Sequence, residues 1–316
     1  MLALVVVWTA VASGSSDHAA DGSATELLAS STVGSPTGAP AGPPGDALGS
    51  TMNSAVKGAV NGMTDPERTV ANPPTTGDPQ VSTDTQSSTD TQVSASAPLP
   101  DDQLACVYAD DPAPRAELAE WQHTVLDTRF KLPPDYAPDD LVELAAALAD
   151  VAPGAAPAGI QLRAVVLSDL RALLSAADAA GMKLAIQSAY RSYSYQESTF
   201  AYWVKQDGYE QALRSSARPG HSEHQLGTAM DFRSLTGPEA WDLDDWATTP
   251  EGAWTSENAW RFGFVMSYPA GAEGVTCYMY EPWHYRYVGR ELAAAVRASG
   301  LTLREYLLAH LVPDAR

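Results

Sequence analysis

Basic residues are scarce in this chain of 316 residues, in which 19 Lys and Arg stand against 39 Asp and Glu and the net charge is -20. A surface of this sign is a poor electrostatic match to phosphate backbones and to anionic lipid. We therefore expect no nucleic-acid partner.

Aromatic residues are almost absent from the first hundred residues, in which Trp8 stands alone. Ala, Ser, Thr, Gly, Pro and Asp dominate this part of the chain, so it has too little apolar side chain to build a core. Residues 14–100 are therefore predicted to be a disordered linker. The folded domain is expected at residues 101–316.

Long hydrophobic runs are also missing, and the apolar run at residues 2–12 is too short to span a bilayer. It ends in Ala10-Val11-Ala12 before a polar tract, which is typical of the apolar core and cleavage site of a secretory signal, although no Lys or Arg precedes it. Residues 1–13 are therefore predicted to be a signal peptide. The mature protein is expected outside the cytoplasm, secreted or associated with the cell wall, with no stable membrane span.

Cysteine occurs only twice, as Cys106 and Cys277. Neither has a partner at the spacing of a metal-ligand motif, which excludes a zinc site built from cysteines. In a cytosolic protein the two would be unrelated buried thiols, but in an exported protein an even count favours a disulfide. We therefore expect Cys106 and Cys277 to be bridged.

Regularly spaced apolar residues follow the linker. Spacings of three and four predict a helix over residues 160–180, which Gly181 would end. Alternation predicts strands over residues 183–190 and 281–288, and residues 196–205 have a helical pattern.

The segments between these elements carry weaker signals. Prolines predict an extended segment at 131–138, followed by a short helix within 139–149. An ordered loop is expected over 236–257 and a short helix over 258–264. Thr302-Leu303-Arg304-Glu305 is a capping box that opens the final helix. Helices at the ends with short strands between them indicate an α+β domain.

Three of the six histidines lie in two short polar segments, where they accompany acidic residues. A catalytic zinc needs three protein ligands, an open position for water and a carboxylate that takes the proton of that water. His224, Asp231 and His284 supply nitrogen, oxygen and nitrogen ligands, and Glu281 supplies the carboxylate. The pattern therefore indicates a catalytic metal site.

The spacing sets a condition on this site. His224 and Asp231 are seven positions apart, so an extended segment would point them to opposite faces. They can share an ion only if His224 lies in a loop or bulge that enters the strand. His221 could also bind metal, but with three other ligands available we interpret it as a surface residue or a neighbour of the ligands.

The sequence around these residues resembles the VanY-type D-alanyl-D-alanine carboxypeptidases, part of a wider group of zinc peptidases that includes lysostaphin and the Hedgehog-like fold. The resemblance covers residues 104–310 and is carried by four motifs: Lys-Leu-Pro-Pro-Asp-Tyr at 131–136, Ser-Ala-Tyr-Arg-Ser at 188–192 with Gln196 after it, Ser-Glu-His-Gln-Leu-Gly-Thr-Ala-Met-Asp at 222–231, and Glu-Pro-Trp-His at 281–284. It implies a small antiparallel sheet flanked by helices.

The resemblance also implies a role for each site residue. The implied ligands of Zn2+ are His224, Asp231 and His284. Glu281 is implied as the general base, and Arg191 as the cation that polarises the scissile carbonyl or stabilises its oxyanion. Ser222 and Gln196 are implied to hold the terminal carboxylate of the substrate.

The expected function is a monomeric zinc D,D-carboxypeptidase that removes the terminal D-Ala from peptidoglycan stem peptides. An L,D-carboxypeptidase or a peptidoglycan endopeptidase on the same scaffold is the alternative, because pocket shape decides between them. A non-catalytic wall-binding module would need the metal ligands but not Glu281. A serine peptidase using Ser222 lacks a nucleophile-elbow pattern.

Overall fold

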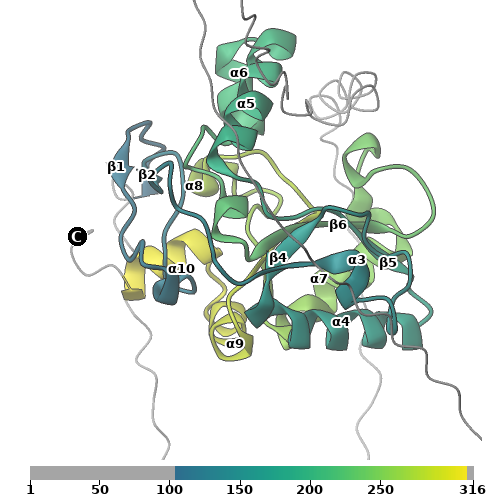
Figure 1. The fold of residues 1–316 in the computed structure, drawn as a ribbon. Helices are drawn as coiled ribbons and strands as arrows, with labels where there is room; N and C mark the ends of the chain where they lie inside the picture. The colour runs from purple at the N-terminus through teal and green to yellow at the C-terminus, as the bar shows by residue number, and fades with distance from the viewer. Residues whose placement is uncertain (1–103, 312–316) are drawn as a thin grey trace, which may run out of the picture. The chain divides into compact units, whose positions relative to one another are not determined.

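A four-stranded antiparallel sheet in the order β5-β6-β8-β7 lies at the centre of the fold (Figure 1). Its strands are β5 (Leu184–Ser188), β6 (Ala229–Ser234), β7 (Phe264–Met266) and β8 (His284–Tyr287). The computed structural model describes residues 104–311, so the predicted signal peptide (1–13) and linker (14–100) lie outside the described residues. The small antiparallel sheet with helices around it confirms the α+β class.

The two faces of this sheet differ in chemistry because side chains alternate along each strand. The apolar face contributes to one buried cluster the side chains of Met230, Phe232, Tyr285 and Tyr287. Helices α4 (Leu167–Ala179) and α7 (Pro250–Asn258) pack against this face (Figure 1). Asp231, His284 and Arg286 alternate with those apolar residues and therefore lie on the opposite face.

Helix α4 begins later than the apolar spacing predicts, and the expected start at residue 160 is wrong. Gln161–Arg163 form β4, which pairs with β3 (Leu141–Glu143). Leu162 belongs to this strand and is fully buried, so its place in the three- and four-residue spacing of the helix is a coincidence. A distant partner also holds the strand, because the backbone N–H of Arg163 donates to the carbonyl of Gly227 at 2.9 Å.

The remaining elements of residues 104–311 are short. Two further strands, which pair in parallel, are β1 (Asp111–Pro112) and β2 (Phe130–Lys131). The other helices are α3 (Leu144–Ala147), α5 (Tyr193–Asp207), α6 (Tyr209–Ser215), α8 (Glu273–Thr276), α9 (Arg290–Ser299) and α10 (Leu303–Leu311). The 3-10 turns are η1 (Leu118–Glu120), η2 (Ala164–Val166), η3 (Glu223–Leu226), η4 (Ala240–Asp242), η5 (Trp246–Thr248) and η6 (Ala259–Phe262). No helix of this part of the chain has the length and apolar character needed to cross a bilayer.

The acidic segment 236–257, expected to be a loop, contains most of α7. Thr249 starts this helix, because its side chain accepts a hydrogen bond from the backbone N–H of Gly252, and Pro250 occupies the first helical turn. This Thr-Pro pair is a local signal that an interpretation based on acidic and Trp-rich composition overlooks. The short helix expected over 258–264 is present as the 3-10 turn η6.

Helix α5 is longer than the predicted helix at 196–205. It begins at Tyr193 because the side chain of Ser192 accepts a hydrogen bond from the backbone N–H of Tyr195. The single short helix expected within 139–149 is divided into β3 and α3.

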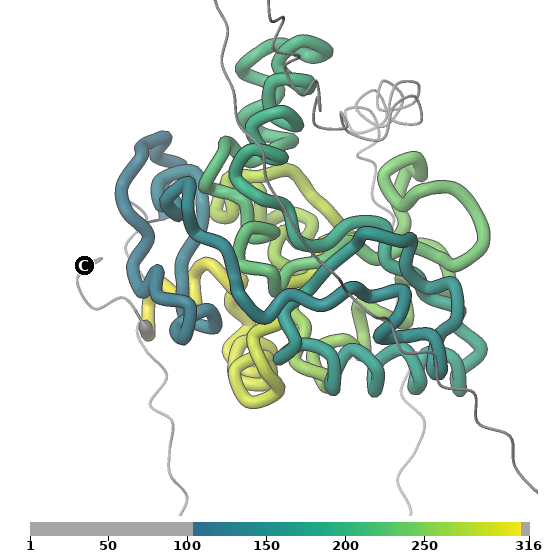
Figure 2. The backbone as a smooth tube through the Cα atoms, viewed as in Figure 1, coloured from purple at the N-terminus to yellow at the C-terminus, as the bar shows by residue number. Residues whose placement is uncertain are grey.

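The two ends of the described chain pack together. The segment that follows residue 104 (blue) lies beside α10 (yellow) in Figures 1 and 2, and Leu104 and Val125 belong with Leu303 to one apolar cluster. The predicted capping box is confirmed: the backbone N–H of Thr302 donates to the carboxylate of Glu305 at 2.8 Å, and the N–H of Glu305 donates to the Thr302 hydroxyl at 3.2 Å.

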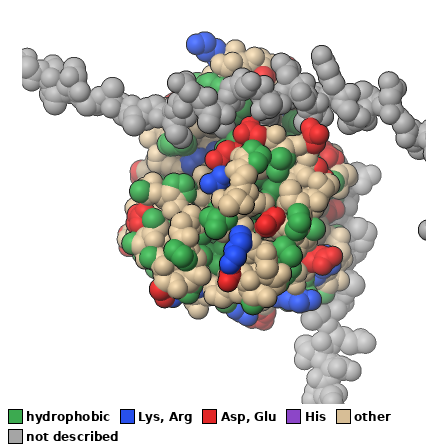
Figure 3. Space-filling model, turned by 90° about the vertical axis from the view of Figure 1, so that its right-hand side faces the viewer, with side chains coloured by type: hydrophobic (Ala, Val, Ile, Leu, Met, Phe, Trp, Pro, Cys, Tyr) green, Lys and Arg blue, Asp and Glu red, His purple; other side chains and the backbone are tan. Residues whose placement is uncertain are grey.

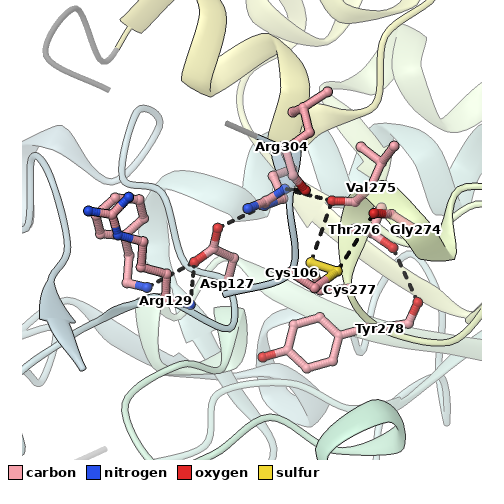
Figure 4. Close-up of a disulfide and its surroundings, with 11 residues drawn as sticks. Cys106, Asp127, Arg129, Gly274, Val275, Thr276, Cys277, Tyr278 and Arg304 are labelled. Carbon is pink, nitrogen blue, oxygen red and sulfur yellow. Dashed lines mark hydrogen bonds and ion pairs between the residues drawn. A yellow bond between two sulfur atoms is a disulfide. The ribbon is translucent and has the colours of Figure 1, made fainter. Parts of the chain in front are cut away.

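Cys106 and Cys277 form the predicted disulfide, with their Cα atoms 5.4 Å apart (Figure 4). Arg304 of α10 lies next to it and donates to the carbonyl of Val275 at 2.7 Å and to the carboxylate of Asp127 at 2.7 Å. Both side chains of this ion pair are buried, at 9% exposure for Arg304 and 1% for Asp127. Covalent and ionic links therefore join the start of the domain to its last helix and to the segment around Cys277.

One face of the molecule is shown in Figure 3. Acidic side chains (red) are distributed among apolar (green) and basic (blue) ones and do not gather in one patch. This face therefore presents no extended field of one sign.

Candidate active site

His224 comes from a tight turn rather than from a strand. It lies in η3, whose four residues are all buried, and Gly227 ends the turn in the left-handed conformation with a φ of 73°. A Cβ atom at Gly227 would lie 2.8 Å from Cγ of Arg163, so both the conformation and the close approach require glycine. Because β6 begins only after this turn, His224 is free of the strand alternation and can share a site with Asp231.

Asp231 and His284 are direct neighbours across β6 and β8. Oδ1 of Asp231 lies 3.1 Å from Nδ1 of His284, and Oδ2 lies 3.4 Å from Nε2 of His224. The two imidazole rings are arranged edge to face with their centroids 4.9 Å apart. One ligand atom from each of the three residues lies within 4.8 Å of the others, as binding of a single metal ion requires.

The outer ring nitrogen of each histidine is held by a hydrogen bond. Nδ1 of His224 donates to the carbonyl of Ala189 at 2.5 Å, and Nε2 of His284 donates to the carboxylate of Glu223 at 3.0 Å. A histidine that binds a metal is neutral and has one N–H, so in that form Nε2 of His224 and Nδ1 of His284 would keep their lone pairs. Nε2 of His224 is buried and has no hydrogen-bond partner in residues 104–311. These residues fit a metal ion, whose histidine ligands are held in this way in known sites.

Negative charge dominates the surroundings of His284. Burial opposes its charged form, but hydrogen bonds to Asp231 and Glu223 raise its pKa to about 10. Burial also opposes the ionised form of Asp231, yet the two neighbouring histidines hold its pKa well below the usual range. Burial and the nearby charge of Arg191 lower the pKa of His224 to about 4. The ionised carboxylates of Asp231 and Glu223 thus give the space beside His284 a negative charge that favours binding of a cation.

Glu281 lies beside the three ligands. Its Oε2 is 3.8 Å from Nδ1 of His284, and its side chain is 20% exposed. Burial raises the pKa of Glu281 to about 7; the charge of Asp231 adds to the shift, while His284 and Arg191 oppose it. A carboxyl group with a pKa near neutrality can both accept and release a proton at the pH where most enzymes work.

Arg191 brings a positive charge to the same place. It follows β5, and its backbone N–H donates to the carbonyl of His224 at 3.3 Å. Its Nε is buried without a hydrogen-bond partner in the part of the chain that the structure describes. Its positive charge lowers the pKa of both His224 and Glu281. A buried donor with a positive charge and no partner is suited to an anionic group.

The two residues assigned to the substrate carboxylate are both buried. Ser222 lies at the N-cap of η3, where its hydroxyl makes no capping hydrogen bond. Gln196 is 1% exposed, and its Nε2 donates to the carbonyl of Ala217 at 2.7 Å, which leaves Oε1 without a partner among the described residues. In this orientation Gln196 supports the segment before η3. Its role in binding a carboxylate, which requires a donor, stays a prediction.

His221 is a buried structural residue and does not lie at the surface. Its Nδ1 is 2.7 Å from the carbonyl of Asp127, and its Nε2 is 3.1 Å from the carboxylate of Asp110. Both ring nitrogens therefore have partners on the segment that precedes β2. The group of three residues whose ligand atoms could hold one metal ion contains His224 and not His221.

Three residues at the site have no role in the sequence-based prediction. Glu223 and Arg286 are buried and form an ion pair at 3.1 Å, and the ring of Tyr268 packs on that of His284 with centroids 4.8 Å apart. Burial alone would raise the pKa of Glu223, but His284 and Arg286 hold it at about 2. Glu223 adjoins His224 in the sequence, but no local pattern shows that its carboxylate is buried against a residue of β8.

Similarity to known proteins covers this same part of the chain. The family model described as VanY: D-alanyl-D-alanine carboxypeptidase matches residues 159–290. The putative carboxypeptidase YodJ of Bacillus subtilis (strain 168) is 37% identical over 186 residues, which are 58% of this chain and 65% of that protein. A D-alanyl-D-alanine carboxypeptidase of Enterococcus faecalis (strain ATCC 700802 / V583) is 37% identical over 151 residues, 44% of this chain and 52% of that protein. The chain thus spans between about half and two thirds of the length of these relatives.

The similarity extends to a solved structure. VanYB in complex with D-Alanine-D-Alanine is 28% identical and superposes with a TM-score of 0.50, covering 60% of this chain and 99% of that chain. The match therefore includes nearly the whole of that chain and somewhat more than half of this one.

Proposed function

The chain belongs to the VanY family of D-alanyl-D-alanine carboxypeptidases, and we propose that it is a zinc peptidase that removes the terminal D-Ala from peptidoglycan stem peptides. The observation that carries the proposal is the buried group His224, Asp231 and His284, with one ligand atom from each within 4.8 Å of the others. Nε2 of His224 is buried without a hydrogen bond among the described residues, although it lies 3.4 Å from Oδ2 of Asp231, and this supports a role in metal binding rather than in packing.

Zinc is the ion that this donor set suits best. Two imidazole nitrogens and one carboxylate oxygen are one of the common sets of three protein ligands of a catalytic zinc, which keeps a fourth position open. When bound, the ion supplies Lewis acidity, which polarises a carbonyl and brings the pKa of water to about 7. Mg2+ and Ca2+ prefer sites made only of oxygen ligands.

The other residues of the site support the chemistry of peptide hydrolysis. Glu281 accepts a proton from the attacking water and returns it to the leaving amine, because its carboxylate lies beside the three ligands, 3.8 Å from Nδ1 of His284. Arg191 stabilises the negative charge that develops on the carbonyl oxygen of the scissile bond. A metal-stabilised binding module would need neither of these two groups.

The relatives support the substrate class. One relative is named a D-alanyl-D-alanine carboxypeptidase, and the solved structure holds D-Alanine-D-Alanine. Because such a substrate is part of the cell wall, the protein would act outside the cytoplasm. The disulfide agrees with an oxidising compartment.

Metal analysis combined with a D-Ala release assay tests the proposal. We expect one zinc per chain, release of D-Ala from a stem pentapeptide, loss of release with a chelator and recovery with added zinc. Zinc without release from the pentapeptide would contradict the D,D-specificity, and assays with the tetrapeptide and with cross-linked peptides would then identify the bond that is cut. A folded, oxidised protein that retains no metal would contradict the site itself.

Removing the charge of Arg191 is expected to slow turnover without emptying the metal site. Arg191→Ala should lower kcat about 10²- to 10³-fold, the usual loss for a group that stabilises the oxyanion. Zinc content should not change, because Arg191 is not in the metal-binding group. Arg297→Ala, which removes an exposed arginine from α9, is the matched control and should keep normal turnover. Normal kcat in Arg191→Ala would exclude the role in the transition state.

A further inference from the structure

Glu223 forms a link between the two segments that carry the histidine ligands. It is the first residue of η3, next to His224, yet its side chain is in contact with His284 of β8. Resting on the proposed metal site, we infer that Glu223 is a positioning residue that makes His284 bind the metal through Nδ1 and prevents the ring from turning.

The contacts of His284 determine which ring nitrogen faces the site. Its Nε2 lies 3.0 Å from Oε2 of Glu223, whereas its Nδ1 lies 3.1 Å from Oδ1 of Asp231. Both nitrogens face carboxylates, which can only accept hydrogen bonds, so the contact with Glu223 does not by itself choose the protonated one. A metal ion held together with Asp231 would need a lone pair on Nδ1, and the proton would then lie on Nε2, where Glu223 accepts it. In the neutral ring, Nδ1 then has the lone pair and points toward the other ligands.

The carboxylate of Glu223 is itself surrounded by donors. Oε2 also accepts a hydrogen bond from the hydroxyl of Ser267 at 2.6 Å, and Oε1 accepts one from NH1 of Arg286 at 3.1 Å. The side chain of Glu223 is 6% exposed. A buried carboxylate whose two oxygens meet three donors has a single orientation that satisfies them all.

Arg286 anchors Glu223 to the rest of the protein. It follows His284 by two positions on β8, so both side chains lie on the same face of the sheet. Its guanidinium is 0% exposed, and NH2 donates to the carbonyls of Trp121 and Thr124 at 2.8 Å each. Glu223 is therefore held between two residues of β8 by a group that is itself fixed, and it transmits that rigidity to His284.

A buried ion pair between Glu223 and Arg286 could also serve stability alone, and Ser267 allows the two roles to be separated. Ser267→Ala removes a hydrogen bond to the same oxygen of Glu223 and leaves both ring nitrogens of His284 with their partners. Glu223→Gln keeps the shape of the side chain but replaces an acceptor-only group by an amide that fits either tautomer of His284. Loss of packing would affect both variants, whereas loss of histidine orientation would affect only the second.

The test compares the full-length, oxidised wild type with Glu223→Gln and Ser267→Ala. Zinc affinity is measured by competition with a chromophoric chelator, and NMR of 15N-labelled histidine shows which nitrogen of His284 binds the ion. We expect Glu223→Gln to weaken zinc binding 10- to 100-fold, as loss of a partner of a histidine ligand does, and Ser267→Ala to change it less than threefold. If the two variants weaken binding equally, in step with their melting temperatures, Glu223 is only structural and the inference is wrong.

Two further measurements cover the remaining outcomes. If Glu223→Gln does not fold, Glu223→Asp takes its place and should weaken zinc binding at least threefold; unchanged affinity would overturn the inference. If the wild type binds no zinc, the proposed function fails, but the metal-free protein still tests Glu223. A Nε2–H of His284 protected from exchange in the wild type and unprotected in the variant supports the role of Glu223, and equal protection in both contradicts it.

Discussion

Replacing Glu281 by alanine is expected to lower kcat for D-Ala release by about 10² to 10⁴, the usual contribution of a general base. The carboxylate lies 3.8 Å from Nδ1 of His284, close enough to receive a proton beside the metal-binding group but outside that group. Zinc content should therefore remain at the wild-type level. Single-turnover kinetics and metal analysis on the same preparation measure both quantities.

Two variants refine this result. Glu281→Gln keeps the size of the side chain but removes its basicity, so it should be about as slow as the alanine variant. Glu257→Ala removes an exposed carboxylate from α7, on the far side of the sheet, and should leave kcat unchanged. Turnover close to normal in Glu281→Ala would remove this residue from the mechanism, and loss of zinc in both Glu281 variants would make it a metal ligand instead.

Reducing the disulfide between Cys106 and Cys277 is expected to lower the free energy of unfolding by about 5 kcal/mol on the chain-entropy model. The bridge closes a loop with a sequence separation of 171. Its loss therefore increases the conformational entropy of most of the unfolded domain, which favours unfolding. Urea unfolding of the oxidised and the reduced protein measures the difference. The double variant Cys106→Ser, Cys277→Ser should match the reduced form.

The folded state should keep its structure without the bridge, because Arg304 holds the same two segments through Val275 and Leu104. We therefore expect the reduced protein to retain zinc and D-Ala release at 25 °C while unfolding at lower urea. Two thiols open to alkylation in the protein purified without reductant would contradict the bridge. Equal unfolding free energies in the two states would contradict its contribution to stability.

Sequence patterns predicted a structural element correctly where the interactions that form it lie within a few residues of one another. The apolar spacing of α4, its end at Gly181 and the capping box at Thr302 and Glu305 all depend on local contacts, and all are present. The motifs at 222–231 and 281–284 also contain the three residues that the fold brings close enough together to share a metal ion. Side-chain chemistry alone limits that group to an ion that accepts two nitrogens and one oxygen.

Only the tertiary structure decided which of these residues are neighbours, because the contacts join positions far apart in the chain. The pairing of Asp231 with His284 is set by the register of β6 and β8, and the strand at Leu162 forms because its partner β3 is available. The burial of Glu223 against His284 depends on how η3 and β8 pack together, and these two segments lie about sixty residues apart in the chain. A local pattern records neither register nor burial, since each arises when segments separated by tens of residues exclude water from one another.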